Sequence, residues 1–128
     1  MSSAISQKIM VVDDERATLA MTSEYLKKRK YQIDSFTDPI EALMHFEKNS
    51  AHYHVVLTDI RMPDMGGLEL ARKMLRVKPD VKIILMTAFE ITAHELERGM
   101  PSIKYEQVLQ EPFPLKVLHD RVKEIFEN

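Results

Sequence analysis

The sequence contains no cysteine among its 128 residues, so disulfides, thiol catalysis and thiolate metal sites are excluded. It has no apolar run of membrane-spanning length, and residues 1–7 lack the charged and apolar regions of a signal peptide. Glycine occurs only three times, and no glycine-rich phosphate loop follows a predicted strand, so a nucleotide-binding enzyme is not expected. These absences favour a cytoplasmic protein without membrane insertion.

No sign of charge dominates the sequence either. Eighteen basic and twenty acidic side chains give a formal net charge of -2. This balance argues against a domain-wide nucleic-acid surface, so we expect no direct binding to nucleic acid. Hydrophobic residues make up 45% of the chain, which is ordinary for a globular protein, and the length fits a single domain over residues 1–128.

The chain is organised around the segment His54–Gly67. It begins with a short apolar run rich in β-branched residues, which predicts a strand buried on both faces. A proline and two glycines end that strand just after Asp59. A second apolar run near the start of the chain closes in the same way, with Asp13 and Asp14. Two predicted strands therefore end in carboxylates.

Strands and helices alternate along the whole sequence, which predicts a parallel sheet covered by helices on both faces. The most apolar strands belong in the middle, so the predicted fold is α/β and flavodoxin-like, with five strands in the order 2-1-3-4-5. We expect strands at about residues 9–13, 31–36, 55–59, 82–87 and 108–110, and helices at 16–30, 38–49, 67–77, from Thr92 to about 99, and from 115 onward. The inward helix positions are predicted to be Leu19, Thr22 and Leu26; Ile40, Leu43 and Phe46; Leu70, Met74 and Val77; and Leu115, Leu118, Val122 and Ile125.

In this strand order a crevice opens outside the carboxyl ends of the first and third strands, where Asp13, Asp14 and Asp59 fall. Neighbouring strands are about 4.8 Å apart, so the three carboxylates lie close together and repel one another. A hard divalent cation, Mg²⁺ or Mn²⁺, relieves this repulsion. The alternative is that Asp14 caps the following helix and Asp59 serves a turn. Thr87, at the end of the fourth strand, brings a hydroxyl to the same rim.

The sequence resembles the receiver domain of two-component response regulators over nearly its whole length. The matching segments are VVDDE at 11–15, LTDIRMPDMGGLEL at 57–70, ILMTAF at 84–89 and EPF at 111–113. The resemblance implies a phosphorylated signalling switch and not an enzyme, and the second segment is the most specific of the four.

The resemblance also assigns roles to residues. Asp59 is expected to accept a phosphoryl group from a histidine kinase or phosphotransfer protein. Magnesium is expected on Asp14, Asp59 and the backbone carbonyl of Arg61, with Asp13 assisting. Thr87 is expected to bond the phosphoryl oxygens, and a downstream protein partner is expected to bind the 92–126 face.

Two positions depart from the family pattern. The residue before Pro112 is lysine in the family and pairs with the phosphoryl group, whereas this chain has Glu111. The aromatic switch position falls on Val108, with Tyr105 near it but out of register. These departures leave two alternatives open. Either Lys104 or another nearby lysine reaches the pocket and substitutes for the family lysine, or the chain is a pseudo-receiver that signals by protein contact without a stable phosphoaspartate.

Two other hypotheses are weaker. A zinc site at His45, His52 and His54 lacks a usual ligand spacing. An aspartate-dependent phosphohydrolase needs a second aspartate two residues after the nucleophile, but position 61 is arginine.

Overall fold

All five predicted strands form in the computed structural model, which describes residues 8–88 and 107–127. They pair in parallel in the order β2-β1-β3-β4-β5, so the predicted topology is confirmed. The strands are β1 (Lys8–Val12), β2 (Gln32–Phe36), β3 (Val55–Asp59), β4 (Lys82–Thr87) and β5 (Val108–Gln110).

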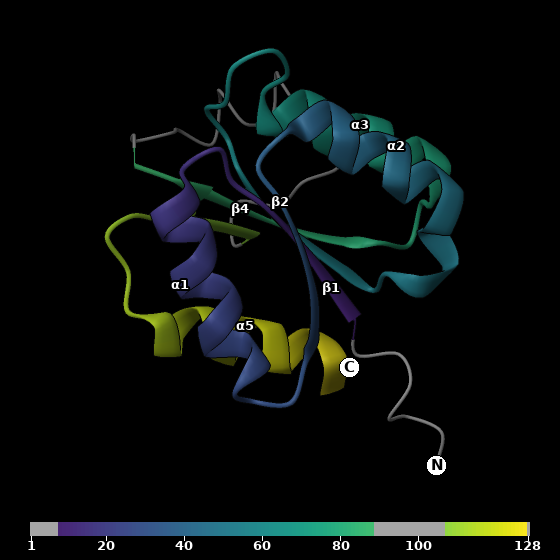
Figure 1. Cartoon of the computed structure of the whole chain (residues 1–128). Coiled ribbons are helices and arrows are strands. Elements are labelled where there is room, and N and C mark those ends of the chain that lie inside the picture. Colours follow the sequence, from purple (N-terminus) through teal and green to yellow (C-terminus); the bar gives the residue numbers. More distant parts are fainter. Residues whose placement is uncertain (1–7, 89–106, 128) are drawn as a thin grey trace.

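Helices cover both faces of this sheet. Figure 1 shows α2 and α3 on one face and α1 and α5 on the other. Their bounds are α1 (Arg16–Lys27), α2 (Pro39–Asn49), α3 (Gly67–Val77) and α5 (Leu115–Glu127), with a short 3₁₀ turn at Ser50–His52. The predicted helix from Thr92 lies outside the described residues. None of the described helices is long and apolar enough to cross a membrane.

Burial explains the strand order. The side chains of β1, β3 and β4 are almost all buried, whereas β2 at the edge is exposed or half-buried along its length. Successive side chains of the central strands point to opposite faces of the sheet and pack in two separate hydrophobic cores, as expected where a sheet is covered on both sides. One core lies under α2 and α3 and includes Phe46 and Met74; the other lies under α1 and α5 and includes Leu26 and Leu118.

The start of α2 is confirmed, but some inward positions are wrong. Asp38 caps the helix, accepting a hydrogen bond from the backbone N–H of Ile40 at 2.9 Å. Phe46 is buried and Leu43 packs half-buried against the core, as predicted, but Ile40 is 44% exposed, and the other buried residues of α2 are Pro39 and Ala42. The small side chain of alanine lets this face pack closely on the sheet.

Two helix ends also differ from the prediction. Val77 is 39% exposed because it is the last residue of α3, where the chain leaves toward β4. The first helix ends at Lys27 and not at Lys30. Residues 28–30 form a turn, and Lys30 has the left-handed φ of 76° that reverses the chain into β2.

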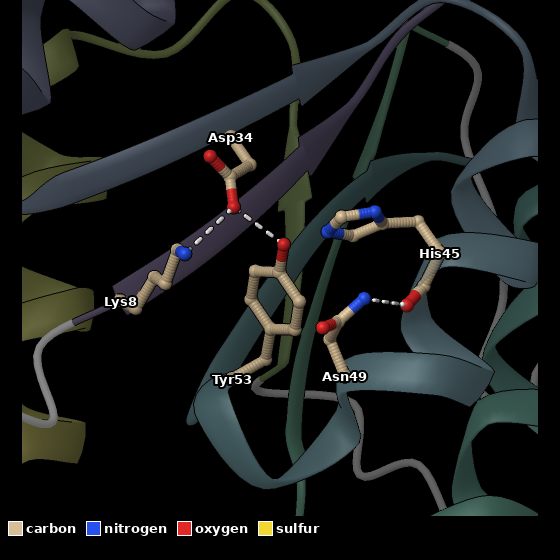
Figure 2. Close-up of polar contacts among 5 residues, drawn as sticks. All are labelled: Lys8, Asp34, His45, Asn49 and Tyr53. Atoms are coloured by element: carbon tan, nitrogen blue, oxygen red, sulfur yellow. Dashed lines mark hydrogen bonds and ion pairs between the residues drawn. The ribbon is translucent and has the colours of Figure 1, made fainter.

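A polar network ties the edge strand to the rest of the sheet (Figure 2). The hydroxyl of buried Tyr53 donates a hydrogen bond to Asp34 on β2, and the ammonium of Lys8 on β1 lies 3.2 Å from the same carboxylate oxygen. Burial, followed by the Asp34 carboxylate, raises the pKa of Tyr53. The tyrosine therefore stays neutral and acts as a fixed donor in this network.

Candidate functional site

The three predicted carboxylates meet at the carboxyl ends of β1 and β3. Val12 and Thr58 are register partners in these adjacent strands, so the residues after them emerge side by side. One carboxylate oxygen from each of Asp13, Asp14 and Asp59 lies within 4.8 Å of the others. This trio is the one group of three or more metal-ligating side chains among residues 8–88 and 107–127.

The β1–α1 junction positions two of these carboxylates differently. Asp13 is only 3% exposed and accepts a hydrogen bond from the backbone N–H of Glu15 at 3.0 Å. Asp14 is exposed, and the N-cap of α1 is Glu15, so the alternative of helix capping by Asp14 is wrong. Asp14 is left at the mouth of the site with its carboxylate near the other two.

Hydrogen bonds of Ile60 fix the backbone directly after Asp59. The N–H of Ile60 donates to the carbonyl of Met86 at 2.9 Å, and the carbonyl of Ile60 accepts from the N–H of Gly67 at 2.7 Å. A Cβ at Gly67 would lie 2.1 Å from the carbonyl oxygen of Asp59, so no side chain fits there. The glycine thus allows the start of α3 to pack directly on the end of β3.

Around this trio lies an open cleft of about 480 Å³. Glu111 and Arg61 both line it, and Glu111 is held by a hydrogen bond from its N–H to the carbonyl of Thr87 at 2.6 Å. The Thr87 side chain is 2% exposed and is not among the lining residues. The lining residues are Asp13, Asp14, Glu15, Thr18, Asp59, Arg61, Ala88 and Glu111.

Sequence reasoning missed three parts of this cleft: the side chains of Glu15 and Thr18, and that of Arg61, to which only a backbone role was assigned. Thr18 lies about one helical turn after Glu15 and donates a hydrogen bond to its carboxylate. The acidic run at 13–15 was an available signal for Glu15. Nothing in the sequence pattern indicates that Thr18 faces the cleft.

Crowding and burial make the site unfavourable for negative charge. Desolvation, followed by the charges of Asp13, Glu111 and Asp14, raises the pKa of Asp59 to about 6. Desolvation, with the charges of Asp14, Glu111 and Glu15, raises the pKa of Asp13 to about 6, although the N–H of Glu15 opposes this. Clustered carboxylate oxygens that resist ionisation are the donor set that a hard divalent cation stabilises, so the residues present fit Mg²⁺.

Other candidate residues lie elsewhere. Val108 is half-buried on β5 and packs against the core under α2 and α3. The ring of His45 packs near Tyr53, and that of His54 stacks on Phe126 with centroids 5.2 Å apart. His45 and His54 therefore take part in aromatic packing, His52 is exposed, and none of the three joins a metal-ligating group in the part of the chain that the structure describes. Tyr105 lies outside those residues.

Comparison with known proteins agrees with this geometry. The family model "Response regulator receiver domain" matches residues 9–123. The sensor kinase CckA of Brucella abortus is 30% identical over 123 residues, which cover 96% of this chain but 13% of the kinase. The response regulator receiver protein CpdR of the same organism is 28% identical over 119 residues, covering 93% of this chain and 96% of CpdR. This chain therefore spans nearly all of one relative and a small part of the other.

Solved structures show the same likeness. The response regulator TrrA of Thermotoga maritima, in complex with Mg²⁺ and BeF, has 32% identity and a TM-score of 0.79, with coverage of 93% of this chain and 98% of that one. A CheY-like receiver from Methanospirillum hungatei has a TM-score of 0.82 at 24% identity, which shows the shared fold.

Proposed function

Because the chain belongs to the response regulator receiver family, whose members are signalling switches phosphorylated on an aspartate, we propose that Asp59 is its phosphoacceptor. The observation that carries this proposal is the position of Asp59. It ends the central strand β3, is half-buried, and opens into the cleft beside the carboxylates of Asp13 and Asp14. A phosphodonor reaches it through that cleft, while the strand holds it in place.

Receiver domains bind Mg²⁺ at an acidic pocket, and we assign this role to the carboxylates of Asp13, Asp14 and Asp59. The backbone carbonyl of Arg61 is the fourth proposed ligand. When bound, the cation screens the repulsion between a carboxylate and an incoming phosphoryl group. The protein contributes the fixed orientation of the ligands through the bonds that Ile60 makes to Met86 and Gly67.

The proposed reaction is a simple transfer. A carboxylate oxygen of ionised Asp59 forms a bond to phosphorus, and the P–N bond to the donor histidine breaks. The imidazole leaves with the electron pair and takes a proton. We place Thr87 as the hydroxyl that bonds the phosphoryl oxygens afterwards. Because it is buried at the end of β4, its side chain or the β4 terminus moves to reach them.

Receiver domains interact with histidine kinases and phosphotransfer proteins. We further propose that a downstream protein partner binds the 92–126 face, of which residues 107–126 are described. Phe113 and Leu115 on this face line an apolar groove of about 460 Å³, which shares Glu111 with the acidic cleft. Val117 on α5 adds an apolar side chain that is 37% exposed. A partner bound there lies next to the phosphorylated residue.

A second candidate function is favoured by Glu111. This glutamate lines the cleft at the family's lysine position and helps to raise the pKa of Asp59. Both effects disfavour a phosphoryl group, as in a pseudo-receiver that signals by protein contact alone.

Intact mass spectrometry decides between the two. The protein is incubated with Mg²⁺ and acetyl phosphate, and Asp59→Asn is the control. We expect the wild type to gain the mass of one phosphoryl group and the variant to gain none. An unchanged mass for the wild type, with the fold intact, would leave the pseudo-receiver as the better description.

A further inference from the structure

The described residues that line the cleft around Asp59 carry more negative than positive charge. Among the described residues that line it, five carry carboxylates and one, Arg61, carries a basic side chain. A phosphoryl group adds a charge of about −1.5 to −2 at neutral pH. A divalent cation offsets this charge but not the remaining carboxylates. Like charges at close range repel strongly in a partly buried cleft, so a further cation near the phosphoryl oxygens is needed.

The backbone next to Arg61 is fixed by hydrogen bonds, close to the proposed phosphoacceptor Asp59. It is two residues from Asp59 and directly follows Ile60, whose N–H and carbonyl are both bonded, to Met86 and Gly67. Its own side chain is exposed at the rim of the cleft. The backbone therefore fixes the attachment point of the arginine side chain two residues from Asp59, and this side chain lines the same cleft.

Glu111 lines the same cleft. The bond from its backbone N–H to Thr87 holds it there, and its half-buried carboxylate repels phosphoryl oxygens. Within this cleft Arg61 attracts phosphoryl oxygens, whereas Glu111 repels them. A guanidinium suits this task because it is planar, always charged and able to bind two phosphate oxygens at once.

We propose that the guanidinium of Arg61 binds the phosphoryl oxygens on Asp59 and takes the role that a lysine at position 111 has in the family. The inference rests on the proposed function, because it requires Asp59 to carry the phosphoryl group. Arg61 then has two roles, with its backbone carbonyl toward the metal and its side chain toward the phosphoryl group.

Beryllofluoride with Mg²⁺ is a noncovalent phosphoryl analogue, and its affinity is measured by calorimetry. Charge-assisted bonds of this kind correspond to about tenfold or more in affinity, so Arg61→Gln should weaken beryllofluoride binding by at least that factor. Its affinity for Mg²⁺ alone should be unchanged or higher, since a nearby positive charge has been removed. Arg61→Lys should fall between the two proteins. Arg76→Gln, on the exposed face of α3, is the matched control and should match the wild type.

The same comparison in a Glu111→Lys background tests whether Arg61 takes the role of the family lysine. In Glu111→Lys the new lysine supplies a second cation beside Arg61, so adding Arg61→Gln should cost several-fold less affinity than it does in the wild type. An equal loss in both backgrounds, or equal beryllofluoride affinity in wild type and Arg61→Gln, overturns the inference while leaving Asp59 as phosphoacceptor. If the wild type binds beryllofluoride no better than Asp59→Asn does, the proposed function fails, and the inference falls with it.

Discussion

Position 111 shows how one side chain sets the electrostatics of a site that the backbone has already built. Glu111 approaches the cleft from the end of β5, and burial together with the charge of Glu15 raises the pKa of its carboxyl group. It is not a member of the close trio of carboxylates, so its effect on Asp59 is exerted across the cleft. Glutamate thus repels a phosphoryl group without joining the metal ligands.

We therefore predict that Glu111→Lys raises the yield of phosphorylated protein from acetyl phosphate. The lysine both removes a repulsive carboxylate and adds a charge-assisted bond of about 1.5–3 kcal/mol. Glu111→Gln separates these effects and should give an intermediate yield. The measurement is the phosphorylated fraction by intact mass at fixed time. An unchanged yield in Glu111→Lys would show that Glu111 is not limiting.

At the scale of elements, the junction between β3 and α3 couples the sheet to the site. The carbonyl of Asp59 ends the strand, and the first residue of α3 packs against it so closely that only glycine fits. The loop between them turns through Asp64, which has a left-handed φ of 69°. The position of Asp59, the proposed phosphoacceptor, therefore depends on a helix start eight residues later in the chain.

Gly67→Ala should disturb both stability and function. The added Cβ forces the backbone of β3 or α3 to shift, and overpacking of this kind costs about 1–3 kcal/mol. We expect a lower midpoint in urea and a weaker Mg²⁺ affinity, because Asp59 moves with its carbonyl. Gly66→Ala is the control: its Cβ would lie 3.1 Å from the carbonyl oxygen of Ile60, a milder conflict. Equal effects of the two substitutions would contradict this account.

At the scale of the whole molecule, the acidic site lowers the stability of the metal-free protein. Three carboxylates held within 4.8 Å of one another are brought together only by folding. Magnesium that binds the native state alone should stabilise it by about 2.7 kcal/mol at a hundredfold excess over the dissociation constant. We expect Mg²⁺ to raise the melting temperature of the wild type and to have little effect on Asp14→Ala. The same shift in both proteins would mean that the site has been assigned to the wrong residues.

The pH dependence of stability should also report on the carboxylates of this site. Burial and neighbouring charge raise the pKa values of Asp13 and Asp59 from 3.8 to about 6, so the folded protein binds these protons more tightly than the unfolded chain does. Their contribution to the free energy of unfolding is fully present below pH 3.8 and is lost as the pH rises through about 6.

Magnesium needs the ionised carboxylates, so its effect has the opposite sign. The increase in melting temperature caused by Mg²⁺ should grow between about pH 5 and about pH 8. Scanning calorimetry with and without Mg²⁺ at each pH measures both trends. A magnesium effect that is constant across this range would contradict the assignment of Asp13 and Asp59 as ligands.

The sequence by itself determined the strand order and the meeting of three carboxylates. Both follow from periodicity, because a run such as Val55–Leu57 is stable only when buried on both faces, and parallel strands bring their carboxyl ends to one edge. The start of α2 at Asp38-Pro39 could also be predicted from the sequence, because capping is a local interaction between neighbouring residues.

Tertiary structure alone decided the rest. Which side of α2 is buried depended on how closely Ala42 could approach the sheet, and hydrophobicity placed Ile40 inward where packing leaves it exposed. The side chains of Arg61 and Thr18 come to one cleft from the loop after β3 and from α1, and no pattern along the chain encodes that distance. The sequence showed Glu111 at the family's lysine position, but charge balance depends on distances in space, so the five carboxylates among the described residues of the cleft became visible only in the folded chain.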